Sequence, residues 1–181
     1  MEIYAAKLPA DAAKQEEHQY GLQLLAQAYG APLPPIAADA HGKPYFTNHA
    51  IEWNLSHSHG LAVCALDAHT VGIDTEKIRP LRPRVVNRSF STAEQNALAE
   101  SEDPDALFTA LWTLKESYVK ALGVGVSYPL QQVEFALDGL QILSHPPDYA
   151  FHLYAWDTYM IACCGHPTAT FPEAFHWVQC T

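Results

Sequence analysis

The sequence predicts a single domain of the α/β (α+β) class, covering residues 1–181 and built from two similar halves. Two observations lead to this prediction. One predicted helix precedes three predicted strands, and two further helices precede two more strands. A strand, turn and strand pattern at residues 53–66 also recurs at residues 151–164. The recurrence predicts a duplicated unit with a pseudo-two-fold axis, divided at about 1–88 and 89–181, although two unrelated hairpins would give the same pattern.

The first half is expected to begin with a helix, because residues 13–29 carry leucines and alanines on one helical face. Prolines at residues 32–35 predict a loop, and residues 41–44 predict a turn. Three strands are then expected at residues 53–56, 61–66 and 71–76, separated by turns at 57–60 and 67–70.

The second half is expected to contain two capped helices. Ser91 and Glu94 match a capping box, in which each side chain bonds the other residue's backbone N–H. Asp103 followed by Pro104 predicts a second start, and this helix should run to about Leu122 and stop at Gly123. Strands at residues 151–153 and 159–164, around a turn at 157–158, complete the half.

The composition favours a globular protein of the cytoplasm. Hydrophobic residues make up 49% of the chain, which is enough for a buried core. No apolar run is long enough to span a membrane, and residues 1–30 do not have the pattern of a secretory signal. The four cysteines form no CxxC pair, so buried thiols are expected rather than a zinc site or a disulfide framework.

The charge is negative overall but contains one basic segment. A net charge of −10 argues against nucleic-acid binding. Five of the ten Lys and Arg residues nevertheless fall within residues 77–88. This basic strip would suit an acidic partner, or it could be a solvated loop, and the sequence favours neither reading. Its members are Lys77, Arg79, Arg82, Arg84 and Arg88.

Asp74 and Glu76 are candidate metal ligands. They stand two residues apart in a predicted strand, so both carboxylates should lie on one face of the sheet. Two like charges side by side are unfavourable unless a cation lies between them. Oxygen ligands suit Mg²⁺, and Mn²⁺ is possible for the same reason. The alternative is an edge-strand pair that simply faces water.

Trp112, Glu116 and Lys120 form one stripe along the predicted helix, because they are spaced four residues apart. A carboxylate for a metal and an ammonium for phosphate oxygens could together bind a metal–diphosphate group. The alternative is an ordinary surface Glu–Lys pair beside a core tryptophan.

Ser56 and His57 begin a polar segment, residues 56–59, that could form a phosphate pocket before Gly60. Lys43, in the stiff turn between Gly42 and Pro44, could reach a second phosphate. A solvated turn is the alternative for both. A serine hydrolase is disfavoured because the chain has no G-x-S-x-G elbow.

Five segments, in order, resemble the motifs of Sfp-type 4′-phosphopantetheinyl transferases. Val71–Lys77 resembles their G-[IV]-D-x-E segment, and Trp112–Gly125 resembles their W-[ST]-x-K-E-[AS]-x-x-K-x-x-G-x-G segment. Asn54–Ser58 is similar to their N-[IL]-S-H-S, and Gly42-Lys43-Pro44 to their G-K-P. Arg88–Ser91 with Glu94 also fits. Together these motifs span roughly residues 41–129.

The resemblance implies a fold of two similar halves with coenzyme A between them. The implied activity is transfer of 4′-phosphopantetheine from coenzyme A to a serine of an apo acyl or peptidyl carrier protein, releasing 3′,5′-ADP. Glu116 is the candidate base that deprotonates the serine, with Asp74 and Lys120 as the other catalytic residues. The implied metal ligands are Asp74, Glu76 and Glu116, and the implied coenzyme A contacts are Lys43, Ser56, His57, Trp112, Lys115 and Lys120.

The chain departs from the family pattern in its first helix, where basic residues toward the 3′-phosphate are usual. Here Glu16-Glu17-His18 takes their place, and His18 could substitute for them. A non-catalytic module that binds coenzyme A or a carrier protein remains the alternative function. A phosphodiesterase is disfavoured, since no H-x-D or H-D pair lies near the motifs. Two halves in one chain predict a monomer.

Overall fold

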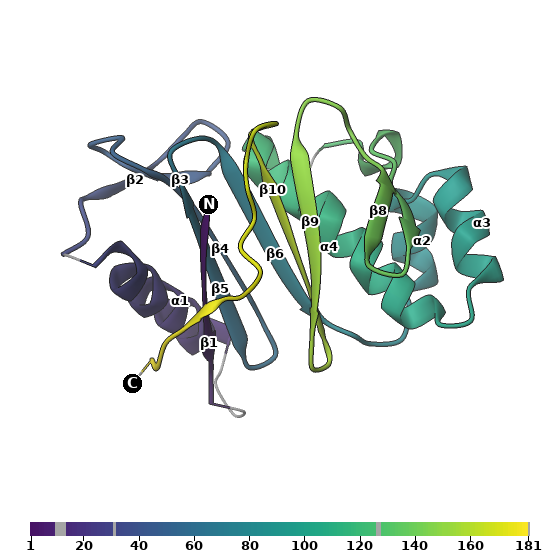
Figure 1. Ribbon diagram of the computed structural model, residues 1–181, viewed down its shortest axis with the longest axis horizontal. Coiled ribbons are helices and arrows are strands. Elements are labelled where there is room, and N and C mark those ends of the chain that lie inside the picture. Colours follow the sequence, from purple (N-terminus) through teal and green to yellow (C-terminus); the bar gives the residue numbers. More distant parts are fainter. Residues whose placement is uncertain (10–13, 31, 126–127, 181) are drawn as a thin grey trace.

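The computed structural model describes residues 1–9, 14–30, 32–125 and 128–180. It has two larger sheets side by side, each covered by one long helix, and two further sheets of two strands each (Figure 1). The mixed α+β class is the one predicted. In chain order the elements are β1 (Glu2–Lys7), α1 (Lys14–Tyr29), β2 (Ile36–Ala38), β3 (Pro44–Phe46), β4 (Glu52–Ser58), β5 (Leu61–Asp67), β6 (Val71–Lys77), α2 (Pro83–Ser89), α3 (Thr92–Glu100), α4 (Pro104–Leu122), a 3₁₀ turn (Leu130–Gln132), β7 (Ala136–Asp138), β8 (Gln141–Ser144), β9 (Ala150–Trp156), β10 (Tyr159–Gly165) and β11 (His176–Trp177).

The first sheet has the strand order β11-β1-β5-β4, and α1 packs on β5 and β4. The second sheet has the order β6-β10-β9, and α4 packs on β6 and β10. Strand β6 lies in the first predicted half of the chain but pairs antiparallel with β10 of the second. The pseudo-two-fold relation between the halves stays a prediction.

Strands β4 and β6 meet where the two sheets adjoin, and side chains bridge them. The Ile73 amide donates to Asn54 Oδ1 at 2.9 Å, and the Thr75 amide donates to Ser56 Oγ at 3.2 Å. The side chains of β4 therefore satisfy backbone groups that another strand would otherwise pair. This seam places Ser56 directly beside Asp74.

Helix α4 lies close against β6 because residue 72 is glycine. A Cβ atom at Gly72 would stand 2.0 Å from Ser117 O and 2.5 Å from Ala121 N. The helix begins with Asp103 accepting from the Ala106 amide at 3.0 Å and ends at Gly123 in the left-handed conformation, as predicted. The predicted capping box of Ser91 and Glu94 is also present.

The structure corrects the predicted turn at residues 57–60. Strand β4 continues to Ser58, and only His59 and Gly60 make the turn, with φ values of 46° and 94°. Two successive positive φ values are typical of a two-residue hairpin turn, which lets both strands pair up to their ends. His57 and Ser58 are therefore strand residues that face opposite sides.

Several elements were not predicted: the six-residue strand β1, the seven-residue helix α2, and the shorter strands β2, β3, β7, β8 and β11. Helix α2 contains Arg84 and Arg88 of the basic strip, with Pro83 in its first turn, while Lys77 ends β6 and Arg79 and Arg82 lie in the connection between them. The four cysteines are free, and three of them are buried, as expected. None of the helices in the described ranges combines the length and apolar character that crossing a bilayer requires.

Candidate active site

Most of the predicted site residues line one cavity of about 300 Å³ at the seam between the sheets. Strand β4 contributes from one side, β6 from another, and α4 closes it. The predicted residues that line it are Ser56, His57, Asp74, Glu76, Trp112, Glu116 and Lys120. The motifs are far apart in the sequence, and the fold brings them together.

Ser56 Oγ is at the centre of the polar contacts in this cavity. It donates to Asp74 Oδ1 at 2.8 Å, and it accepts from Lys120 Nζ at 3.0 Å and from the Thr75 amide. Lys120 Nζ also lies 2.6 Å from Asp74 Oδ1 and 3.2 Å from Ile73 O. The ammonium of Lys120 is thus held over β6 by one carboxylate, one hydroxyl and one carbonyl.

Asp74 keeps one oxygen free for another ligand. Its Oδ2 atom is buried and has no hydrogen-bond partner among the residues that the structure describes. An unpaired buried carboxylate oxygen is costly, and it needs a cation, a proton or water to satisfy it. The oxygen belongs to a residue that lines the cavity, so a cation bound there would satisfy it.

Glu116 has an unusual ionisation. Burial, followed by the charge of Asp74, raises the pKa of Glu116 to about 7; Glu76 adds to the rise and Lys120 opposes it. Three carboxylates therefore influence one another across this cavity. Such mutual repulsion is what a bound divalent cation would relieve.

The residues of this cavity have the chemical groups of a metal site, but they are not arranged as one in this structure. Within the described ranges, no three His, Cys, Asp or Glu side chains converge into a ready metal site. Asp74, Glu76 and Glu116 nevertheless supply the oxygen donors that Mg²⁺ prefers, and one of those oxygens is unpaired. The donor set fits a hard divalent cation.

A second cavity, of about 600 Å³, adjoins the first and shares His57, Glu116 and Lys120 with it. Its other walls are largely apolar and come from α1, β4 and the turn before β3. His18 lines this cavity, and its ring centroid is 6.4 Å from that of His57. Glu17 Oε2 lies 3.3 Å from His57 Nδ1.

Lys43, which was predicted to contact a phosphate, lines the second cavity, but its ammonium is held by the protein. Lys43 Nζ donates to Ala121 O at 2.9 Å and to Val71 O at 3.5 Å, so it caps the C-terminal end of α4. Burial lowers the pKa of Lys43. A phosphate contact would require this ammonium to turn away from the helix end.

Lys115, predicted to contact coenzyme A, is placed away from these cavities. Its side chain is 0% exposed and forms an ion pair with Glu94 at 2.8 Å. Its ammonium also donates to Leu130 O and Val133 O. Lys115 is one residue before Glu116, so its side chain leaves α4 about 100° away from that of Glu116. It connects α4 to Glu94 of α3 and to the 3₁₀ turn. A direct contact with a ligand in these cavities is not open to it.

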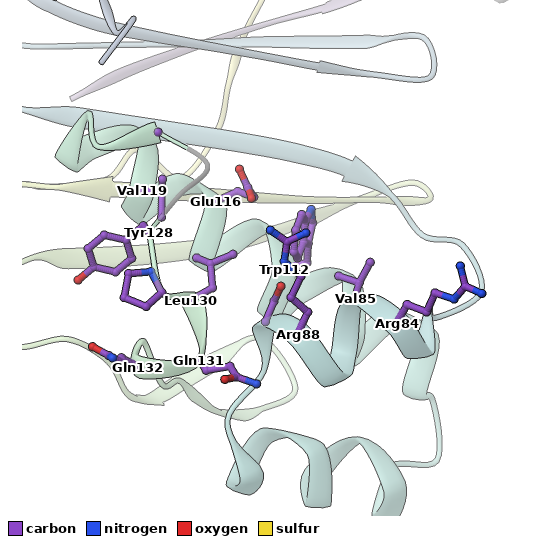
Figure 2. Close-up of a pocket in the computed structure, with 13 residues that line it drawn as sticks. Arg84, Val85, Arg88, Trp112, Glu116, Val119, Tyr128, Leu130, Gln131 and Gln132 are labelled. Carbon is purple, nitrogen blue, oxygen red and sulfur yellow. The ribbon is translucent and has the colours of Figure 1, made fainter. Parts of the chain in front are cut away.

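The basic strip is divided by the fold. Arg84 and Arg88 of α2 line a third cavity of about 590 Å³, together with Trp112 and Glu116 of α4. Figure 2 shows Glu116, Trp112 and Arg88 bordering this space, with Gln131 and Gln132 on its other side. Arg79 instead turns toward Glu76 and His59.

Sequence reasoning placed Ser58 and His59 in a segment that could bind phosphate, but it did not predict that they lie beside Glu76. Ser58 Oγ donates to Glu76 Oε2 at 2.7 Å, and His59 contacts both Ser58 and Arg79. The signal was the alternation of Asn54, Ser56 and Ser58, which puts all three side chains on one face of a strand that reaches residue 58. Treating residues 57–60 as a turn concealed it.

Comparison with known proteins places these features in one family. The model of the 4′-phosphopantetheinyl transferase superfamily matches residues 70–164. The chain is 35% identical over 156 residues to 4′-phosphopantetheinyl transferase Sfp of Bacillus subtilis (strain 168), covering 81% of this chain and 64% of that protein. It is 33% identical over 157 residues to 4′-phosphopantetheinyl transferase psf-1 of Bacillus pumilus, covering 81% of this chain and 67% of that protein.

A solved structure with a weaker likeness is holo-[acyl-carrier-protein] synthase (AcpS) of Thermotoga maritima, at 20% identity and a TM-score of 0.46 over 54% of this chain and 62% of that one. The chain spans about two thirds of the length of the two curated relatives above. The matched residues 70–164 contain Asp74, Glu76, Trp112, Glu116 and Lys120. On the family model and these identities, the chain belongs to the 4′-phosphopantetheinyl transferase superfamily.

Proposed function

We propose that this chain transfers the 4′-phosphopantetheine group of coenzyme A to a serine of an apo acyl or peptidyl carrier protein and releases 3′,5′-ADP. The observation that carries the proposal is the position of Glu116, which lines all three cavities at once. One cavity would hold the nucleotide, one the diphosphate, and one the approaching carrier. Membership of the superfamily supports the same reaction.

The second cavity suits the nucleotide of coenzyme A. Its apolar walls would hold the adenine ring, and its polar groups would meet the phosphates. His57 and Lys120 lie between this cavity and the first, so they would contact the diphosphate as it crosses. Lys43 and His18, which line this cavity, are the other candidate phosphate contacts, whereas Ser56 would act by holding Lys120 and Asp74.

Glu116 is the proposed base. Its side chain lines both the cavity proposed for the diphosphate and the cavity proposed for the carrier, so the carrier serine would reach it there. It would take the proton of the carrier serine as that oxygen attacks the β-phosphorus of coenzyme A. The bond from phosphorus to the oxygen of the 3′,5′-ADP group then breaks, and Lys120 stabilises the negative charge on the phosphate oxygens.

Asp74, Glu76 and Glu116 would hold a Mg²⁺ ion, with Mn²⁺ as a substitute. The ion would neutralise charge on the diphosphate and on the departing 3′,5′-ADP. Asp74 Oδ2 is the oxygen with no protein partner among the described residues, so it is the first ligand that we assign. Asp74 Oδ1 would remain with Lys120 and Ser56.

The carrier would dock along α2. Arg84 and Arg88 line the cavity that leads to Glu116, and their charges would attract an acidic carrier surface. Lys77 and Arg82 would extend this positive surface. A single chain supplies every residue of the proposed site, so a monomer would suffice.

The proposal is tested by intact-mass spectrometry of an apo acyl carrier protein incubated with the enzyme, coenzyme A and Mg²⁺. We expect a gain of one phosphopantetheine mass, lost on addition of EDTA and lost in Asp74→Asn. A control variant, Glu100→Gln at the exposed end of α3, should retain the gain. No gain with several carriers, while coenzyme A still binds, would support the alternative of a non-catalytic binding module.

A further inference from the structure

Arg79 belongs to a closed ring of polar contacts around Glu76. Arg79 Nη1 lies 2.9 Å from His59 Nε2, and Arg79 Nη2 lies 3.5 Å from Glu76 Oε2. His59 Nδ1 lies 3.0 Å from Ser58 Oγ, which lies 2.7 Å from Glu76 Oε2. The Arg79 side chain is only about one third exposed, at 36%, although its sequence position suggests a surface charge.

The chemistry of the groups fixes the direction of every hydrogen bond in this ring. Arginine can only donate, so His59 Nε2 accepts from Arg79. The proton of the neutral ring is then on His59 Nδ1, which donates to Ser58 Oγ. Ser58 donates its own hydrogen to Glu76 Oε2. Both branches from Arg79 therefore end on the same carboxylate oxygen.

The ring leaves the other oxygen of Glu76 available. In the part of the chain that the structure describes, the hydrogen bonds and the ion pair of Glu76 all involve Oε2. Glu76 lines the cavity that also contains Asp74 and Glu116. With Oε2 held by two donors, the carboxylate is fixed in orientation and Oε1 remains for another ligand.

The position of His59 is itself fixed from both sides of its turn. Its carbonyl oxygen accepts from Tyr159 OH at 2.5 Å, and the amide of the next residue, Gly60, donates to Glu17 Oε1 at 3.3 Å. His59 also has a φ of 46°, a left-handed conformation that asparagine or glycine adopts more readily in such turns. The turn thus holds an imidazole where a different residue would suit the backbone better.

We propose that Arg79 and His59 are positioning residues, which hold Glu76 in the orientation that binds a divalent cation, and that Arg79 does not dock the carrier. This inference rests on the proposed function for the identity of the cation site. Arg79 would then not belong to the surface with which the basic strip was expected to meet an acidic partner. Partners that orient metal ligands in this way affect metal affinity about 10- to 100-fold in other proteins.

The sharpest test is His59→Asn, with His49→Asn as its matched control. Asparagine followed by Gly60 suits the turn, so the fold is kept, but its side chain is too short to join Arg79 to Ser58. His49 has nearly the same backbone, with a φ of 48°, but its ring stacks on Tyr45 instead. Mn²⁺ affinity, measured by electron paramagnetic resonance without carrier protein, should fall about tenfold in His59→Asn and stay unchanged in His49→Asn.

Arg79→Lys distinguishes a role of Arg79 in orienting Glu76 from a role of its positive charge alone. Lysine keeps the charge, but its single ammonium cannot reproduce the fork that reaches both His59 and Glu76. We expect the same loss of Mn²⁺ affinity, with the KM for the carrier unchanged. A docking role would give the reverse, namely normal Mn²⁺ affinity and a raised KM. That result, or wild-type affinity in His59→Asn, would overturn the proposal, as would a wild-type chain that binds no Mn²⁺.

The Mn²⁺ titration needs neither carrier nor turnover, so it is independent of the transfer assay. If transfer fails while the two histidine variants differ as expected, the proposed function is wrong and the positioning role stands. If transfer succeeds while the two variants bind Mn²⁺ equally, the positioning role is wrong and the proposed function stands.

Discussion

At the scale of single residues, the site is built on paired groups with one exception. Lys120 is paired with Asp74, and Glu76 is held by Ser58. Glu116 is set apart, because its neighbours Asp74 and Glu76 have the same charge and it is largely buried. The raised pKa of Glu116 therefore makes it a carboxyl group whose charge changes near neutral pH in the metal-free protein.

This pKa has a consequence for stability in the metal-free protein. The ordinary pKa is 4.5 and the folded value is about 7, so the folded chain binds more protons between these values. The stability associated with the protonated form is fully present below pH 4.5 and is lost as the pH rises through 7. We expect Glu116→Gln to raise the free energy of unfolding at pH 8 by about 1–3 kcal/mol and to leave it nearly unchanged at pH 4.5.

Urea unfolding with EDTA present, at pH 4.5 and pH 8, measures this difference. Glu100→Gln, at an exposed position at the end of α3, is the control and should change stability equally at both pH values. A Glu116→Gln variant that is no more stable than wild type at pH 8 would mean that Glu116 is not a strained carboxyl.

Sequence alone could assign residue types to the site but not always their partners. Helical spacing correctly grouped Trp112, Glu116 and Lys120, because i and i+4 positions share a face whatever the surroundings. It could not give the partner of Lys115, since Glu94 and the 3₁₀ turn approach it only through tertiary packing.

At the scale of elements, the site depends on how closely α4 approaches β6. Strand and helix periodicity predicted both elements and the caps of α4, because these are local properties. That β4 lies beside β6 could not be predicted, since the contact is made by side chains of Asn54 and Ser56 rather than by a backbone ladder. The strands β2, β3, β7, β8 and β11 were also missed, because two to four residues carry too little pattern.

Gly72→Ala tests the close approach of these two elements. The added methyl would meet the backbone of α4 at Ser117 and Ala121, which cannot turn aside as a side chain could. We expect a loss of about 3 kcal/mol in the free energy of unfolding, as for an overpacked core. The matched control is Gly21→Ala in α1, where the new Cβ would be 3.8 Å from Leu55 Cδ1 and the helix should gain stability. Equal stabilities in urea would show that α4 can move away from β6 without cost.

At the scale of the whole molecule, the protein is acidic, but basic side chains line one of the cavities that reach its proposed site. The net charge is −10, yet Arg84 and Arg88 line the cavity that reaches Glu116. The sequence could locate the basic strip but not divide it. Only the fold shows that α2 directs Arg84 and Arg88 toward that cavity while Arg79 turns back to Glu76.

Reversing a charge on α2 should weaken binding of the carrier protein and leave binding of coenzyme A nearly unchanged. We expect Arg88→Glu to raise the KM for the carrier about tenfold, or about 1.4 kcal/mol, with little change in the KM for coenzyme A. Lys7→Glu changes the net charge equally at an exposed position on β1, outside the three cavities, and is the control. The effect should shrink in high salt. Equal carrier KM values for the two variants would remove α2 from the docking surface.

Ser56 Oγ already makes every hydrogen bond that a hydroxyl group can make, so a substitution at this position would affect several contacts at once. A hydroxyl offers one hydrogen and two lone pairs, and here Asp74 takes the hydrogen while the Thr75 amide and Lys120 take the lone pairs. Two of those contacts, to Asp74 and Thr75, join β4 of the first sheet to β6 of the second, and the third is made to Lys120 of α4. A substitution at this position would therefore disturb the polar contacts of the cavity and the contact between the sheets together.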